Sequence, residues 1–166
     1  VVLGSADVAN VDSAFSFVSV TNDRGDATDD DEPVNAGTAR LNQGSLRQVI
    51  LNANAIAGTQ TVDFSVGTGQ VTINVSGSAL PAIDGTLFLD GRTQAGYSGT
   101  PLVLIDGNNT VGNGLTLTAN ADGSTIRGLI IRDFSVYGIS IQANSDNNVV
   151  YGNYLGGLDF AGGDAG

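Results

Sequence analysis

The acidic stretch between residues 21 and 44 contains the side chains best suited to binding a metal ion. Four of its acids are consecutive and two more lie just before them: Asp23 and Asp26, then Asp29, Asp30, Asp31 and Glu32. Carboxylate oxygens are hard ligands of the kind that Ca²⁺ prefers, although the spacing lacks the bend glycine of an EF-hand loop. Two interpretations stay open for the four consecutive acids: a Ca²⁺ site, and a solvated loop without an ion.

The residue types that are missing exclude several kinds of chemistry. The chain has 166 residues and contains no His, Cys, Lys, Met or Trp. Without His and Cys, the usual ligand sets of zinc, haem and iron–sulfur clusters cannot be assembled, so we expect no required cofactor. The net charge of −11 repels phosphate backbones and argues against a nucleic-acid partner. No apolar run approaches the ~20 residues of a membrane-spanning helix, so we expect no membrane span.

One amphipathic helix is predicted after the acidic stretch. Ser45 is a good N-cap, and Gln48 three residues later completes a capping box. Gly58 is expected to end the helix. The apolar residues recur at helical spacing and form one face: Leu46, Val49, Ile50, Ala53 and Ile56. A helix with a single apolar face must cover another part of the molecule.

The remaining chain has the pattern of short strands. Residues 14–20 read as one strand before the acidic stretch. From residue 61 onward, short apolar runs alternate with clusters of Gly, Asn, Asp and Ser rather than with helical patterns. These runs cover residues 62–66, 71–75, 87–89, 102–105, 115–117, 126–131, 139–141 and 149–155.

A repeat of 24 residues links the later strands. Residues 114–128 align with residues 138–152 without a gap and share five identities in 15 positions. Leu115 aligns with Ile139, and Leu117 aligns with Ile141, so the apolar character of both positions is kept. A period of this length, divided by turn residues, is typical of the stacked repeats of a solenoid. We therefore expect these four side chains to point inward and to stack on one another.

Several sequence motifs resemble those of a known family. Residues 44–50 read GSLRQVI and residues 52–54 read NAN, which is similar to the GSLRQAI…ANA signature of bacterial secreted and surface β-helix proteins in the pectate-lyase-like superfamily. Further matching motifs are ALPAI at 79–83, DGRTQAGY at 90–97, IDG at 105–107, GSTIRGL at 123–129 and GNYLG at 152–156. The resemblance covers roughly residues 15–166.

This resemblance, together with the repeat, predicts the fold class and the domain organisation. We expect an all-β, right-handed parallel β-helix: a three-sided solenoid of about four coils with one short N-terminal capping α-helix. Residues 1–60 are predicted to hold the first strand, the acidic loop and the capping helix. Residues 61–166 are predicted to form the coils, within a single domain overall.

Some members of this superfamily are enzymes, so the resemblance raises the possibility of catalytic residues in this chain. Lyases of this superfamily use a basic residue together with acidic residues that hold Ca²⁺, and hydrolases use a pair of carboxyl groups. Arg127 and the pair Arg132 and Asp133 are the basic–acidic candidates. Arg127 aligns with Tyr151 one repeat later, which predicts that no polar row continues across the strands. With Lys and His absent as well, we expect no catalytic residues in this chain.

The last predicted coil lacks a recognisable cap, because Leu158 and Phe160 are the only large apolar residues after residue 155. An uncovered strand edge is a template for further pairing. The expected partners are a second copy stacked end to end, the rest of a longer chain, or a surface polysaccharide. The sequence thus predicts a non-catalytic structural or adhesive module of an extracellular bacterial surface protein that self-assembles into filaments. The alternative is a polysaccharide-active fragment, either a lyase or a hydrolase, or one that binds carbohydrate through Ca²⁺.

Overall fold

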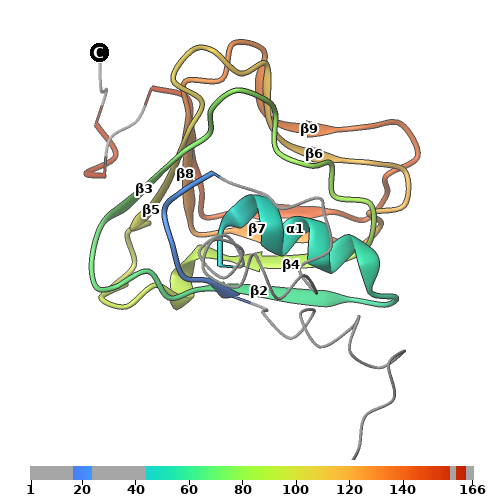
Figure 1. The fold of residues 1–166 in the computed structure, drawn as a ribbon, viewed down its shortest axis with the longest axis horizontal. Helices are drawn as coiled ribbons and strands as arrows, with labels where there is room; N and C mark the ends of the chain where they lie inside the picture. Colours follow the sequence, from blue (N-terminus) through green and yellow to red (C-terminus); the bar gives the residue numbers. More distant parts are fainter. Residues whose placement is uncertain (1–16, 24–43, 158–159, 164–166) are drawn as a thin grey trace, which may run out of the picture.

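The computed structural model describes residues 17–23, 44–157 and 160–163. The four consecutive acids Asp29, Asp30, Asp31 and Glu32 lie outside the described residues. Within the described part, one α-helix and a set of short strands alternate with turns (Figure 1). None of its helices is long and apolar enough to cross a membrane.

The predicted helix is α1 (Leu46–Ala55), and its N-cap is the predicted one. The Ser45 Oγ accepts a hydrogen bond from the Gln48 backbone N–H at 3.1 Å. The helix ends three residues before Gly58, with Ile56 as its C-cap. Leu46 and Ile50 are fully buried, so the apolar face does cover the core. Gln48, expected off that face, is also buried, and its side-chain amide donates to the Asn52 Oδ1 at 3.0 Å.

All strand pairs in the described structure are parallel, and they form three sheets. The five-stranded sheet has the order β1 (Phe17–Val18), β2 (Gln60–Phe64), β4 (Leu87–Asp90), β7 (Thr125–Arg127) and β10 (Val149–Tyr151). The four-stranded sheet has the order β11 (Tyr154–Leu155), β8 (Leu129–Arg132), β5 (Val103–Asp106) and β3 (Val71–Asn74). The two-stranded sheet pairs β6 (Asn113–Leu117) with β9 (Tyr137–Ile141).

The prediction of an all-β, three-sided, right-handed parallel β-helix of about four coils is wrong. The chain is mixed, with about 10% of its residues in helix and 34% in strand, and its parallel sheets are several, short and unequal in size. The physical reason is that the 24-residue repeat does not extend to the earlier strands. Gln60 pairs with Leu87, 27 positions further on, and Phe88 pairs with Thr125, 37 positions further on. The connections therefore differ in length from one strand pair to the next.

The strand pairs predicted by the repeat are nevertheless present. Leu115 pairs with Ile139, and Val150 pairs with Ile126, each 24 positions apart. Leu115 and Leu117 are fully buried, as expected. Ile139 is only partly buried and Ile141 is 47% exposed, because β9 is the last strand of its sheet.

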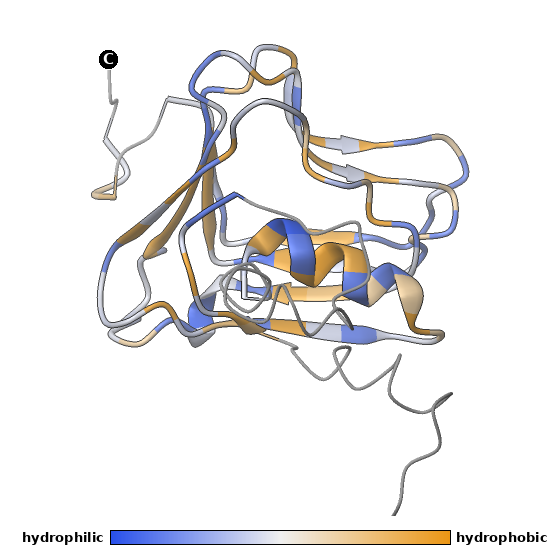
Figure 2. Cartoon of the chain, in the orientation of Figure 1, coloured by the Kyte–Doolittle hydropathy of each residue, from blue (hydrophilic) through white to orange (hydrophobic). Residues whose placement is uncertain are grey.

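The core lies between the sheets and under α1 (Figure 2). Alternate residues of successive strands stack inward, and the five-stranded sheet contributes Val62, Leu89 and Ile126, all at most 1% exposed. Leu46 and Ile50 of α1 belong to the same buried cluster. Such aliphatic stacks stabilise the fold by roughly 25 cal/mol for each Å² of apolar surface removed from water.

Gly91, directly after β4, packs closely against the turn between β7 and β8. A Cβ atom at this position would collide with the Gly128 carbonyl oxygen and with the Leu129 side chain. We predict that Gly91→Ala lowers the free energy of unfolding by about 1–3 kcal/mol, because backbone atoms must move. Urea denaturation followed by circular dichroism measures the change. Gly85→Ala, whose Cβ would meet no atom within 4 Å, is the matched control. Equal stability of the two variants would contradict this account of the packing.

Candidate functional site

A row of polar side chains crosses the outer face of the five-stranded sheet. Strand register places Asp63 of β2 beside Asp90 of β4, Asp90 beside Arg127 of β7, and Arg127 beside Tyr151 of β10. We call these four residues the polar row. Val62, Leu89 and Ile126, which precede the first three of them, are buried in the core, so the polar row lies on the opposite, outer face of the sheet. Phe17 of β1 continues the same alignment beyond Asp63.

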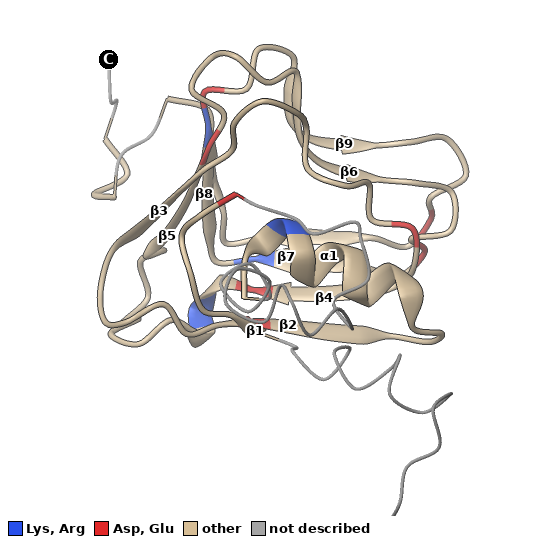
Figure 3. Ribbon diagram, in the orientation of Figure 1, with Lys and Arg blue, Asp and Glu red and all other residues tan. Residues whose placement is uncertain are grey.

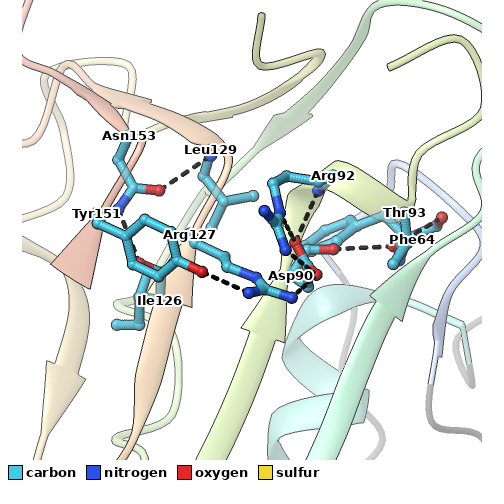
Figure 4. Close-up of polar contacts among 9 residues, drawn as sticks. All are labelled: Phe64, Asp90, Arg92, Thr93, Ile126, Arg127, Leu129, Tyr151 and Asn153. Atoms are coloured by element: carbon cyan, nitrogen blue, oxygen red, sulfur yellow. Dashed lines mark hydrogen bonds and ion pairs between the residues drawn. The ribbon is translucent and has the colours of Figure 1, made fainter. Parts of the chain in front are cut away.

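Asp90 is the centre of the polar row, and two arginines bind it (Figure 4). The Arg92 Nε donates to its Oδ1 at 3.0 Å, and the Arg127 Nη2 donates to its Oδ2 at 2.5 Å. Asp90 also caps the short 3₁₀ helix η3 (Gly91–Thr93) by accepting from the Arg92 backbone N–H. Burial alone would raise the pKa of Asp90, but the hydrogen bonds from Arg127 and Arg92 lower it below its usual value.

Arg127 is held from three sides. Its guanidinium lies over the Phe88 ring, 4.4 Å from the ring centroid, which is a favourable cation–π geometry. Its Nη1 donates to the Tyr151 hydroxyl, while Nη2 binds Asp90. Its Nε is buried and has no hydrogen-bond partner among the described atoms. The side chain is therefore fixed in place over the sheet rather than free to reach a substrate.

Asp63 differs from Asp90, because no arginine binds its carboxylate among the described residues. Among the described residues, no hydrogen bond or ion pair reaches its carboxylate. Burial raises the pKa of Asp63, the negative charge of Asp90 raises it further, and Arg127 only partly opposes them. Two carboxyl groups on adjacent strands thus have opposite pKa shifts, so one accepts a proton more readily than the other. Asp63 also lines a pocket of about 280 Å³.

The basic–acidic candidates from the sequence do not form one site. Arg127 belongs to the polar row, whereas Arg132 lies at the end of β8 in the four-stranded sheet. There Arg132 binds Asp106 at 3.4 Å and its neighbour Asp133 at 3.2 Å. Figure 3 shows that the charged residues of the strands lie at separate places on the sheets. Each arginine therefore has its own local carboxylate partner.

The interpretation that no polar row continues past Arg127 is wrong. Its alignment with Tyr151 is confirmed, but the tyrosine hydroxyl accepts a hydrogen bond from the guanidinium and so extends the row. The roles of Asp63, Asp90 and Arg92 were missed. One signal was available: each residue of the polar row directly follows an apolar residue of its strand, namely Val62, Leu89, Ile126 or Val150.

No group of three or more acidic side chains suited to a metal lies within the described part of the chain. Ca²⁺ binding by Asp29, Asp30, Asp31 and Glu32, which lie outside it, stays a prediction. The chain matches no protein-family model, and it has no significant match among curated proteins or solved structures. The resemblance to the pectate-lyase-like superfamily therefore also stays a prediction.

The ion pairs of Asp90 predict a clear stability effect. Asp90→Asn leaves Arg92 and Arg127 without their anion while both remain partly buried. We predict a loss of about 1.5–3 kcal/mol in the free energy of unfolding, the range for hydrogen bonds to charged groups. Urea denaturation at neutral pH measures it. Asp146→Asn, an exposed residue with the same change in charge, is the control. A loss no larger than that of the control would show that the ion pairs add nothing.

Asp63→Asn is predicted to have the opposite effect. The folded-state pKa of Asp63 is raised, so its ionised form destabilises the fold, and this effect grows as pH rises through that pKa. Removing the charge should stabilise the protein at pH 7 by about 0.2–1 kcal/mol, the size of a cross-strand side-chain interaction. The gain should vanish at a pH well below 4, where both states are protonated. Denaturation of both proteins across this range tests the sign, and destabilisation at pH 7 would refute it.

Proposed function

We propose that this chain is a non-catalytic structural or adhesive module of an extracellular protein, and that it associates through the strands β9, β10 and β11. These strands are each the last of their sheet, and we call them together the open edge. The acidic, cysteine-free composition, rich in Gly, Asn, Asp and Thr, favours the extracellular location.

The observation that carries this proposal is the concentration of exposed apolar side chains at the open edge. Among the described residues, eight large apolar side chains are exposed, and seven of them lie on or next to these three strands. They are Val136, Tyr137, Ile141, Val149, Val150, Tyr151 and Leu155, with exposed fractions from 37% to 59%. A concentration of exposed apolar side chains of this kind is typical of an interaction site.

The backbone of the open edge also lacks the usual protection against pairing. Natural edge strands are commonly blocked by charged residues or proline. The sequences of β9, β10 and β11 are YGISI, VVY and YL, which contain neither. The Val149 N–H donates to the Ser124 carbonyl at 2.8 Å, so the backbone groups of Val150 point the other way, toward the open edge. A further strand can therefore pair there.

The opposite end of the five-stranded sheet differs, because α1 lies against β1. The Arg47 guanidinium donates to the carbonyls of Ser78 and Ala79 at 2.8 and 2.7 Å and pairs with Asp23. The Asn54 side chain bonds to the backbone of Ala82 and Asp84. One end is thus covered by a fixed helix, whereas no described strand pairs with the outer edges of β9, β10 and β11 at the other end. Two copies that meet through their open edges form a closed pair, which needs no second complementary face, so we propose a pair in place of the filament expected from the sequence.

The arginines support a non-catalytic role. Each of the four arginines in the described chain is bound to an aspartate: Arg47 to Asp23, Arg92 and Arg127 to Asp90, and Arg132 to Asp106. A lyase cleaves a polysaccharide by elimination, and its general base must be free to accept a proton from the substrate. Guanidinium groups in ion pairs keep their protons, so none of these four is suited to that task.

Light scattering over a range of protein concentrations tests the proposal. We expect the mass to rise from the 16.8 kDa chain mass toward twice that value. Ile141→Lys places a charge on the open edge and is expected to keep the protein monomeric. Thr59→Lys, with the same charge change on an exposed loop, should associate like the original chain. Monomers at every concentration, or turnover of an acidic polysaccharide, would contradict the proposed function.

A further inference from the structure

The pocket beside Asp63 lies at the opposite side of the five-stranded sheet from the open edge. Its walls come from β1, from β2 with the residue after it, and from the turn after β4: Phe17, Asp63, Phe64, Ser65, Thr93 and Ala95. Thr93 forms a fixed wall, because its hydroxyl accepts from the Phe64 N–H at 2.6 Å and donates to the Asp90 carbonyl at 2.8 Å. The pocket is an open depression at the side of the sheet, in which Ser65, Thr93 and Ala95 are exposed and Thr93 is held in place by these hydrogen bonds.

Among the described residues that line this pocket, Asp63 is the only charged one. Arg127 of the polar row and Arg92 beside it both bind Asp90 instead. The carboxylate of Asp63 therefore has a negative charge and no hydrogen-bond donor within the described structure. A group that ionises beside another anion, without a partner, destabilises the fold, and such groups are typical of binding sites.

The other walls define what kind of cation fits. The pocket of about 280 Å³ is mainly apolar, with an aromatic ring from Phe17 and a methyl group from Ala95. Aromatic faces attract organic cations as well as their aliphatic stems. A Ca²⁺ ion needs six to eight oxygen ligands, and one carboxylate with one or two hydroxyls does not supply them. The lining thus fits an organic cation better than a metal ion.

We propose that this pocket binds a primary ammonium group carried on an aliphatic stem. The ammonium lies at the Asp63 carboxylate, where the Ser65 hydroxyl offers a second acceptor. The stem packs against the Phe17 ring and Ala95. Residues 1–166 contain no lysine, so a lysine-type ammonium is not supplied by this sequence itself. This site is independent of the open edge and adds a chemical specificity to the module.

The test is a titration with butylammonium chloride, followed through the backbone amide NMR signals of Phe64, Ser65 and Ala95. Neutral butanol at matched ionic strength is the parallel probe. We expect saturable shifts with butylammonium and a dissociation constant in the millimolar range, which is usual for so small a ligand. Asp63→Asn should weaken binding roughly tenfold or more, because the charge-assisted hydrogen bond is lost. Asp146→Asn, with the same charge change on an exposed turn, should bind like the original chain.

Two results would overturn the proposal: equal responses to butylammonium and butanol, or unchanged binding by Asp63→Asn. The Asp63→Asn variant is expected to be at least as stable as the original chain, so unfolding does not obscure its effect. Ile141→Lys, altered only at the open edge, should bind butylammonium normally. Failure of the ammonium site would leave the mass distribution unchanged, so it is distinguishable from failure of the proposed association.

Discussion

Parallel pairing between strands that are distant in sequence is the constraint on which the rest of this structure depends. The partners in neighbouring strands are between 24 and 46 positions apart, from Val150 with Ile126 to Phe17 with Asp63. Each pairing sets a register, and the register decides which side chains stack inward and which face water. A slip of one residue would exchange the buried Leu89 for Asp90 and would place a carboxylate in the core.

Polar side chains extend this pairing where the strands stop. The Gln94 side chain bonds to the N–H and the carbonyl of Val66 at 3.0 and 2.8 Å. The Asn153 side chain bonds to the Leu129 N–H and the Ile126 carbonyl in the same way, at 3.0 and 2.9 Å. Buried backbone N–H and C=O groups beyond the ends of the strands need hydrogen-bond partners. The side-chain amides of Gln94 and Asn153 provide both a donor and an acceptor. The turns are thereby held at the spacing of the strands.

The same register produces both functional candidates. It aligns Asp63, Asp90, Arg127 and Tyr151 on one face, where the arginines neutralise Asp90 and leave Asp63 without a partner. It also places β9, β10 and β11 together as the last strands of their sheets, with their apolar side chains uncovered. One side of the molecule therefore offers backbone and apolar surface, while the other offers a single unpaired charge in a pocket. The two proposals thus rest on different kinds of surface on one scaffold.

The sequence by itself determined the elements whose signals are local or strictly periodic. The Ser45 cap, the buried face of α1 and the 24-residue pairing of Leu115 with Ile139 follow from short-range hydrogen bonding and from a repeat without gaps. The tertiary structure alone decided the pairing of Phe88 with Thr125, the sizes of the three sheets and the position of Asp63 beside Asp90. The reason is that these pairings follow connections of unequal length. A periodic pattern in the sequence does not indicate which strand pairs with which after such a connection.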